Sequence, residues 1–206
     1  MSEIILGKAT NPRLSAKTLD NMFQLRDLVF NQKLGWKVKS HNGRERDTFD
    51  DLDPIYMVCV GGQDKVEGCW RLLPTVGPYM LQKTFPELLR GESAPVNRRV
   101  WELSRFAIAP SSTDLRQVNL SSTTFEMIRH VYDFAVANEL DYYVTVTSVA
   151  LERLLKKVGI PLRRFGDGEA VRIGKVLSVA CWVPIDDEFR NAVYPCLVES
   201  EQQRVA

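Results

Sequence analysis

The segment VWELSRFAI occupies residues 100–108, and Pro110 follows it. Its apolar and aromatic side chains predict a central strand, which the proline ends because proline has no backbone N–H. Glu102 and Arg105 lie on this otherwise apolar strand. An unpaired buried charge is strongly unfavourable, so we expect these two residues to be paired or functional.

The segments around this strand predict interleaved helices and strands. Hydrophobic spacing over residues 15–30 predicts a helix capped by Ser15 or Thr18. Apolar runs within residues 56–73 flank GGQDK and predict a hairpin. Five further elements are predicted: a helical segment within 74–95, a helix from Ser121 or Ser122 to Asn138, a strand at 142–147, a helix at 149–158 and a strand at 176–183 that closes the sheet.

This order of elements predicts an α/β fold, a three-layer α/β/α sandwich with a mixed central sheet, rather than a barrel or a helical bundle. The chain has 206 residues and is 45% hydrophobic, which suffices for a sizeable core. We therefore expect one domain over residues 1–206.

Composition excludes several classes of function. The formal charge of +1 argues against binding of nucleic acid, which normally needs a concentrated basic face. Four cysteines without CxxC spacing and two histidines make a zinc site improbable, so no metal is expected. The N-terminus lacks a signal-peptide pattern, and no stretch is long enough to span a bilayer. We expect a cytoplasmic protein without a membrane partner.

Large aromatic residues recur beside charged ones in the N-terminal quarter. Arg26, Phe30 and Trp36 precede Asp47 and Asp50. The two aspartates lie in a polar segment, residues 35–53, which is predicted to be a long loop over a site. Aromatic faces next to fixed charges suit a small ligand with a ring and a cation or a carboxylate. For any one of these residues, surface charge or ordinary core is the alternative.

An ordered set of eight residues resembles the acyl-homoserine lactone synthases, the bacterial quorum-sensing autoinducer synthases. The family pattern has Arg, Phe and Trp, then two acidic residues, an Arg after a Gly, and Glu-x-x-Arg. The matching residues here are Arg26, Phe30, Trp36, Asp47, Asp50, Arg71, Glu102 and Arg105. Further similarity lies in GPYML at 77–81, TFPELL at 84–89 and VTVT at 144–147. The resemblance covers most of the chain.

The resemblance implies a fold like that of GCN5-related N-acetyltransferases. Those enzymes usually hold a CoA pyrophosphate on a loop with two small glycine or alanine positions at a helix N-terminus. The corresponding segment here is RQVNLS, residues 116–121, with Asn119 and Ser121 at those positions. Close backbone approach to a pyrophosphate is disfavoured there. An ordinary CoA-dependent acetyltransferase is therefore less favoured, although an acyl-CoA donor held in another way stays open.

The resemblance also implies the reaction. The α-amine of S-adenosylmethionine attacks an acyl thioester, and the methionyl carboxylate then displaces the sulfonium, which releases methylthioadenosine. Glu102 is the expected general base, with Arg105 beside it in the catalytic set, and backbone amides of the strand or of a bulge in it are the expected oxyanion donors. S-adenosylmethionine is a substrate, and no cofactor is expected.

Seven residues are expected to bind S-adenosylmethionine. The set is Arg26, Phe30, Trp36, Asp47, Asp50, Arg71 and Arg105. The aromatic rings would face the sulfonium and an aspartate would balance its charge, while Arg71 and Arg105 would bind the ligand carboxylate or fix the acids. The alternative is a structural ion network of Glu102, Arg105, Asp47 and Arg71.

The acyl chain and its carrier are assigned by similarity and by pattern. The expected acyl pocket consists of Met80, Leu103, Phe106, Val144, Thr145, Val146 and Val149, each equally explained as core. Thr145 matches a family position near the third acyl carbon, where a hydroxyl would favour a 3-oxo group; a β-branched strand residue is the alternative. The expected docking residues for acyl carrier protein are Arg153, Lys156, Lys157 and Arg163, unless they are only a solvated helix face.

Three functions are therefore compared. The first is lactone synthesis with an acyl carrier protein or acyl-CoA donor. The second is CoA-dependent N-acetyl transfer to another amine, and the third is a catalytically dead module that binds an acyl or adenosyl group. Release of methylthioadenosine distinguishes the first from the other two.

Overall fold

The computed structural model describes residues 2–110 and 121–195. Eight strands form one sheet in the order β1-β4-β5-β6-β7-β10-β8, and β9 pairs with β10. The strands are β1 (Glu3–Gly7), β4 (Ile55–Val60), β5 (Val66–Pro74), β6 (Val100–Ile108), β7 (Tyr142–Ser148), β8 (Arg163–Arg164), β9 (Val171–Ile173) and β10 (Val176–Pro184). The pair β6 and β7 is parallel and the other pairs are antiparallel, so the sheet is mixed as predicted.

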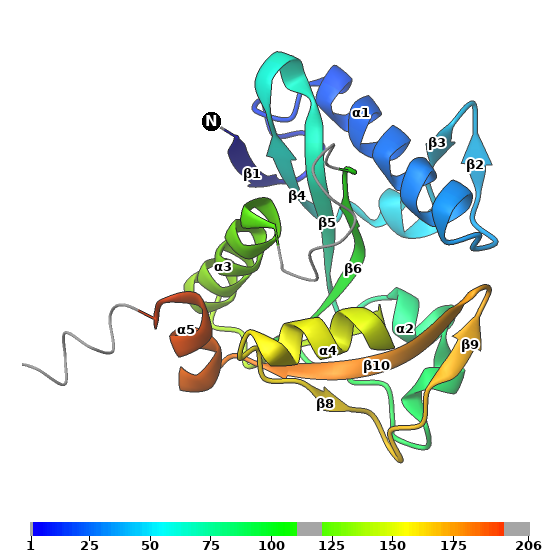
Figure 1. Ribbon diagram of the computed structural model, residues 1–206, viewed down its shortest axis with the longest axis vertical. Helices are drawn as coiled ribbons and strands as arrows, with labels where there is room; N and C mark the ends of the chain where they lie inside the picture. Colours follow the sequence, from blue (N-terminus) through cyan, green and yellow to red (C-terminus); the bar gives the residue numbers. More distant parts are fainter. Residues whose placement is uncertain (1, 111–120, 196–206) are drawn as a thin grey trace, which may run out of the picture.

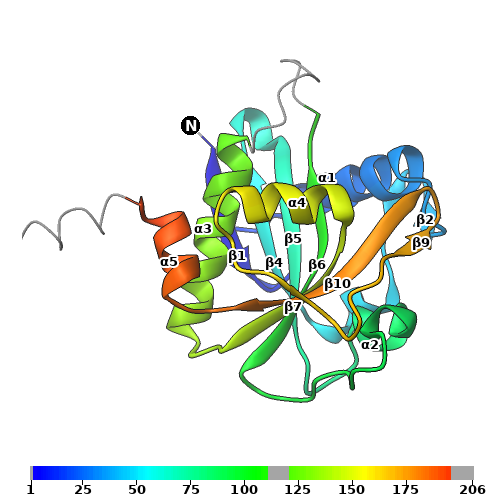
Figure 2. The ribbon, with the colours of Figure 1, turned by 60° about the horizontal axis from the view of Figure 1, so that its bottom comes forward.

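Helices cover both faces of the sheet (Figures 1 and 2). One layer contains α3 (Ser122–Ala137), α4 (Val149–Lys157) and α5 (Asp187–Val193). The other contains α1 (Ala16–Arg26), the π-helix η1 (Asp27–Lys33), α2 (Met80–Lys83) and the 3-10 helix η4 (Pro86–Leu89). The predicted three-layer α/β/α fold is confirmed. The boundary of a single domain at 1–206 includes residues beyond the described ranges and stays a prediction.

Successive side chains of a strand pack into two different cores, one on each face of the sheet. On β4, Met57 and Cys59 pack with the α3 layer, whereas Tyr56 and Val58 pack with the α1 layer. Successive strand residues point to opposite faces, so a strand buried on both sides is apolar throughout. This explains why β4 appears in the sequence as a continuous apolar run.

Local sequence patterns predicted the positions of most helices and strands correctly. Ser15 caps α1 by accepting a hydrogen bond from the backbone N–H of Thr18, at 3.0 Å. Ser121 caps α3 in the same way through Thr124, at 3.1 Å. Both serines lie among the predicted capping residues. In the described part of the chain, no helix has the length and apolar character needed to cross a bilayer.

Three parts of the fold differ from the sequence prediction. Strand β1 was missed, because its burial comes from pairing with β4 some fifty residues later, from Glu3↔Val60 to Gly7↔Tyr56. Strand β10 does not close the sheet, since β8 and β9 pair with it. The predicted loop over residues 35–53 contains a hairpin of β2 (Ser40–His41) and β3 (Arg44–Glu45) and the 3-10 helix η2 (Thr48–Leu52).

The sheet divides at β6 and β7, where the site lies. Their parallel pairing ends at Leu103↔Thr145, so the following residues of the two strands have no partner across the divide. The β5–β6 register also shifts, because Cys69 pairs with Ala107 but Arg71 pairs with Ser104. This is a β-bulge at Arg105, whose φ is +58°. The bulge directs the Arg105 side chain to the same face as Arg71.

Candidate active site

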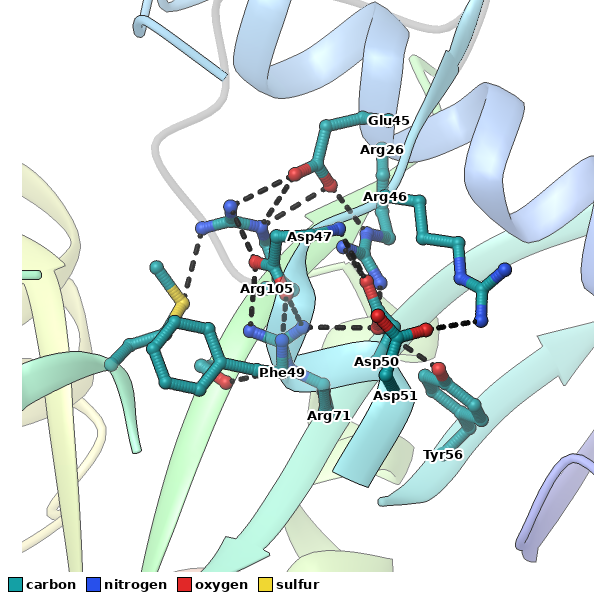
Figure 3. A network of polar contacts seen from close by, with 12 residues as sticks. Arg26, Glu45, Arg46, Asp47, Phe49, Asp50, Asp51, Tyr56, Arg71 and Arg105 are labelled. Carbon is teal, nitrogen blue, oxygen red and sulfur yellow. Dashed lines mark hydrogen bonds and ion pairs between the residues drawn. The ribbon is translucent and has the colours of Figure 1, made fainter. Parts of the chain in front are cut away.

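Three arginines and three carboxylates form a compact network beside the divide in the sheet (Figure 3). Its members are Arg26, Glu45, Asp47, Asp50, Arg71 and Arg105. They come from α1, β3, the segment around η2, β5 and β6. The formal charges balance within the network, so it is self-neutralising.

Asp50 is the centre of the buried part. Its carboxylate accepts two hydrogen bonds from Arg26, at 2.8 and 2.9 Å, and one each from Tyr56 and Arg71, both at 2.9 Å. Burial alone would raise the pKa of Asp50, but Arg26 and Arg71 hold it below its usual range. Burial favours loss of the proton from Arg26, yet Asp50 and Glu45 raise its pKa overall.

Asp47 connects Arg71 to Arg105. It accepts from Arg71 at 2.6 Å and lies 2.8 Å from an Arg105 nitrogen, and it also accepts from the backbone N–H of Phe49 at 2.9 Å. The Asp47 side chain is 13% exposed and that of Arg105 is 5%, whereas Arg71 and Asp50 are at 0%. Asp47 and Arg105 are thus the outermost members of the network.

Glu45 belongs to this network and was missed in the sequence. Its carboxylate contacts Arg26 at 2.6 Å and Arg105 at 2.8 Å, and its side chain has no exposed area. The turn of the β2–β3 hairpin is Asn42-Gly43, with φ of 51° and 71°. An Asn-Gly pair is a strong local signal for such a turn, and it would have predicted the short strand that carries Glu45, opposite Ser40.

A cavity of about 110 Å³ opens where β6 and β7 separate; we call it the central cavity. It is lined by Phe30, Leu34, Trp36, Met80, Phe85, Glu102, Ser104, Arg105, Phe106, Val146, Thr147, Ser148, Leu151 and Val176. The structure therefore brings four of the eight residues predicted for catalysis and S-adenosylmethionine binding to one space: Phe30, Trp36, Glu102 and Arg105. Arg26, Asp47, Asp50 and Arg71 do not line it.

Aromatic rings form one wall of the central cavity. The centroids of Phe30 and Trp36 are 5.4 Å apart, and those of Trp36 and Phe85 are 6.1 Å apart. The Arg105 guanidinium lies over the Phe30 ring at 5.2 Å. Phe30 is on the π-helix η1, whose wider turn continues α1, and π-helical turns often occur at functional sites.

Glu102 is buried on β6 and is separate from the arginine network. Its two oxygens accept hydrogen bonds from the backbone N–H groups of Met80 and Leu81, at 2.9 and 2.6 Å. Burial raises the pKa of Glu102, and the two N–H groups offset this only in part. The alternative of a structural network thus holds for Arg105, Asp47 and Arg71, but Glu102 forms no ion pair within the described residues.

A second cavity of about 40 Å³, the inner cavity, continues between the sheet and the α3–α4 layer. It is lined by Trp70, Leu103, Ser104, Arg105, Phe106, Ile128, Thr145, Val146, Thr147, Leu151 and Leu155. Six of these residues line the central cavity too, so the two spaces adjoin. The sequence missed Trp70, Ile128, Leu151 and Leu155 here, because their spacing was equally explained by core packing.

Five of the seven residues expected in the acyl pocket line one of the two cavities. They are Met80, Leu103, Phe106, Thr145 and Val146. Val144 is fully buried in the core around Phe165, and Val149 begins α4. Neither Val144 nor Val149 lines the two cavities.

The four predicted docking cations have different surroundings. Lys156 pairs with Glu152 at 2.9 Å, and Arg163 pairs with Glu92 at 2.6 Å. Arg153 and Lys157 are exposed on α4 and form no ion pair with any described residue. The predicted CoA-loop segment 116–121 lies outside the described residues except for Ser121.

No group of His, Cys, Asp and Glu suited to a metal ion occurs in residues 2–110 and 121–195. The three cysteines in these ranges are buried, and burial raises the pKa of Cys69 to about 12. These thiols are therefore protonated at neutral pH.

The chain matches the family described as Autoinducer synthase over residues 11–193. An acyl-homoserine-lactone synthase of Aliivibrio fischeri is 40% identical over 190 residues, which cover 92% of this chain and 98% of that protein. The crystal structure of the AHL synthase LasI has a TM-score of 0.84 and 35% identity, with 95% of both chains covered. TofI, in a ternary complex with an inhibitor and MTA, has a TM-score of 0.75 and 30% identity, with coverage of 93% and 96%.

A more distant likeness concerns the fold alone. A putative N-acetyltransferase from Lactobacillus plantarum has a TM-score of 0.58 at 12% identity, with 90% of this chain and 99% of that chain covered. The expected resemblance to N-acetyltransferases is confirmed at the level of fold.

Proposed function

Because this chain belongs to the autoinducer synthase family and is an acyl-homoserine-lactone synthase, we propose that its central cavity holds S-adenosylmethionine against an acyl thioester. The enzyme joins the acyl group to the α-amine and closes the lactone with release of methylthioadenosine. The observation that carries the assignment of the site is the cavity at the β6–β7 divide, which joins a buried carboxylate, a guanidinium and an aromatic wall.

Phe30 and Trp36 hold the sulfonium and the adenosyl group. Their rings are 5.4 Å apart and both line the cavity. A cation within about 6 Å of an aromatic face is attracted to the ring. The rings can therefore hold the methionyl chain in the folded pose that lactone closure needs.

Arg105 binds the methionyl carboxylate. It lines the cavity, its guanidinium covers Phe30, and it has Glu45 and Asp47 behind it. Asp47, at the outer limit of the network, supplies negative charge for the cationic ligand. Arg26, Asp50 and Arg71 act indirectly, because their side chains are at most 1% exposed and both arginines pair with Asp50. Their proposed role is to fix Arg105 and Asp47.

Glu102 accepts the proton of the α-amine, directly or through a water. A carboxylate has about four acceptor positions, and the N–H groups of Met80 and Leu81 occupy two of them. The Ser104 hydroxyl takes a further position, which leaves one for the substrate. Its raised pKa brings the carboxyl closer to the pH at which a general base works best.

Backbone amides at the divide stabilise the tetrahedral oxyanion. The β6–β7 ladder ends at Leu103↔Thr145, and the bulge at Arg105 disturbs the other ladder of β6. Strand residues beyond these points can direct N–H groups into the cavity. Such preorganised donors are typically worth about 10²- to 10³-fold in rate.

Acyl carrier protein is the favoured donor. Arg153 and Lys157 present two cations on α4 without partners among the described residues, and an acidic carrier would meet them. A cytoplasmic location and the absence of a cofactor or metal stay predictions.

The test is a product assay. The purified protein is incubated with S-adenosylmethionine and acyl donors of several lengths, on carrier protein and on CoA, and both products are quantified by mass spectrometry. Lactone and methylthioadenosine in equal amounts are expected. Acyl transfer to another amine without methylthioadenosine would favour the N-acetyltransferase alternative.

A further inference from the structure

We propose that Asp27 is a positioning residue for S-adenosylmethionine, because it fixes the segment that carries Phe30 and Trp36 in place beside the ion network. The inference rests on the proposed function, in which these two rings hold the sulfonium substrate. Asp27 itself does not line the central cavity, and the sequence did not predict it as a site residue.

Asp27 is a buried carboxylate held by neutral donors. It is 2% exposed, and it accepts hydrogen bonds from the side-chain amides of Asn31, at 3.0 Å, and Gln32, at 2.8 Å, and from the hydroxyl of Ser40. These bonds, that of Ser40 first, keep the pKa of Asp27 below its usual range although burial alone would raise it. The carboxylate is therefore ionised at neutral pH and acts only as an acceptor.

The three donors lie at the two ends of one segment. Asn31 and Gln32 belong to η1, whereas Ser40 begins β2. Backbone hydrogen bonds of a π-helix join residues five apart, and this wide turn lets one carboxylate at its start reach both amides. Asp27 thus closes residues 31–40 into a loop whose two ends are attached to one side chain.

Trp36 lies inside this loop and depends on it for its orientation. Its backbone N–H donates to the carbonyl of Phe30 at 2.9 Å, which joins the two aromatic residues. The indole Nε1 of Trp36 is buried and has no hydrogen-bond partner among the described residues. The ring is therefore placed by its packing and by its backbone, and Asp27 fixes that backbone at both ends of the loop.

Ser40 connects the same loop to the ion network. It is opposite Glu45 in the register of the β2–β3 hairpin. Glu45 pairs with Arg105 at 2.8 Å, and Arg105 lies over the Phe30 ring. Asp27 therefore joins the aromatic wall to the hairpin that holds Arg105, and its loss should loosen both sides of the substrate site.

The first test is kinetic and separates substrate binding from the chemical step. Asp27→Ala removes all three contacts and should raise KM for S-adenosylmethionine about 5- to 20-fold, within the range that hydrogen bonds to a charged group supply. The kcat at saturating substrate should stay within about twofold, because the groups that react are unchanged. Asp27→Asn should recover most of the affinity, since it keeps the shape and the amides of Asn31 and Gln32 can turn over to pair with it.

Two further variants complete this series. Ser40→Ala removes one contact at an exposed residue and should raise KM about two- to fivefold, so it tests the inference even where Asp27→Ala fails to fold. Asp133→Ala on α3 is the control for loss of a hydrogen-bonded carboxylate elsewhere. It removes the acceptor of a 2.7 Å bond from Tyr194 in the opposite helical layer and should leave KM unchanged.

Nuclear magnetic resonance reads the position of Trp36 without turnover. In ¹⁵N-labelled protein without ligand, the indole N–H signal absent from Trp36→Phe identifies Trp36. Asp27→Ala and Ser40→Ala should shift or broaden this signal. The signals of the other three tryptophans, Trp70, Trp101 and Trp182, should keep their positions.

Unchanged KM for S-adenosylmethionine in folded Asp27→Ala or in Ser40→Ala, or a fall in kcat alone, would overturn the inference. Indole spectra in which all four signals change together, or in which none changes, would overturn it as well. Unchanged S-adenosylmethionine affinity in Trp36→Ala would instead contradict the proposed function of the cavity. The ligand-free spectra would still decide whether Asp27 positions Trp36.

Discussion

The carboxylate of Glu102 accepts a hydrogen bond from the backbone N–H of Met80, at 2.9 Å. The sulfur of Met80 in turn accepts from Arg105 at 3.2 Å. Glu102 thus faces the cavity and also fixes the start of α2, which forms part of the cavity wall.

Glu102→Gln should lower kcat by about 10²- to 10⁴-fold, the usual contribution of a general base. The amide keeps one acceptor for the N–H groups of α2, so S-adenosylmethionine affinity should fall much less. Steady-state kinetics combined with calorimetry measures both quantities. Near-normal turnover in a folded variant would remove Glu102 from the base role.

The pH dependence of kcat/KM should follow ionisation of Glu102. Burial raises the pKa of this carboxyl above its ordinary value of 4.5, and a base is active when ionised. Activity should therefore rise with pH through that raised pKa. A pH–rate profile checks this, and Glu102→Gln should lack the acid limb. An unchanged limb in the variant would assign it to another group.

Trp36→Ala should weaken S-adenosylmethionine binding by roughly 1–2 kcal/mol, because it removes an aromatic face from the cation site. Trp36→Phe keeps an aromatic face and should retain most of the affinity. Calorimetry on the two variants makes the comparison. Unchanged affinity in folded Trp36→Ala would exclude a direct contact.

Asp50→Asn should destabilise the fold by about 3–5 kcal/mol, because it breaks a buried ion network. Asp51→Asn is the matched control, since Asp51 is 63% exposed and pairs with Arg46 on the surface. Its cost should stay below about 1 kcal/mol. Denaturant unfolding of both variants gives the two values.

The Asp50 contribution also has a defined pH dependence. The folded pKa lies below the ordinary value of 3.8, so the stabilisation is complete above pH 3.8 and declines as pH falls below it. Acid unfolding of wild type should contain this component, and Asp50→Asn should lack it. Equal pH dependence in the two proteins would contradict the network energetics.

Reversal of Arg153 and Lys157 to Glu should lower kcat/KM with acyl carrier protein and reduce its dependence on salt. Activity with a matched acyl-CoA should change little. Lys17→Glu on α1, in the opposite helical layer, is a control for reversal of one surface charge away from α4. Assays with both donors over a range of ionic strengths measure this effect. Unchanged rates with acyl carrier protein would show that Arg153 and Lys157 only form a solvated helix face.

The elements that were predicted correctly are those with clear local signals in the sequence. Strand β6 and the β4–β5 hairpin have apolar runs with clear ends, and Ser15 and Ser121 mark helix starts. Strands β8 and β9 have two and three residues, and pairing with β10 defines them. No local pattern of that length identifies a strand.

The sequence named most of the charged residues of the ion network but not how they pair. Arg26 and Arg71 were assigned to ligand binding with Asp50, and in the structure both pair with Asp50, which depends on the packing of α1, η2 and β5. Glu45 was missed although the Asn42-Gly43 turn that positions it was visible. The indole Nε1 of Trp70 and the Oγ1 of Thr147 are buried without a hydrogen-bond partner among the described residues, and only three-dimensional packing reveals this.

The central claim is that S-adenosylmethionine binds in the cavity at the β6–β7 divide. A crystal structure of the enzyme with S-adenosylmethionine and an unreactive acyl donor analogue tests it most directly. The account predicts the ligand carboxylate within hydrogen-bond distance of Arg105, the sulfonium against Phe30 and Trp36, and the α-amine within reach of Glu102. Ligand density outside this cavity, with Arg105 and Glu102 out of contact, would contradict it.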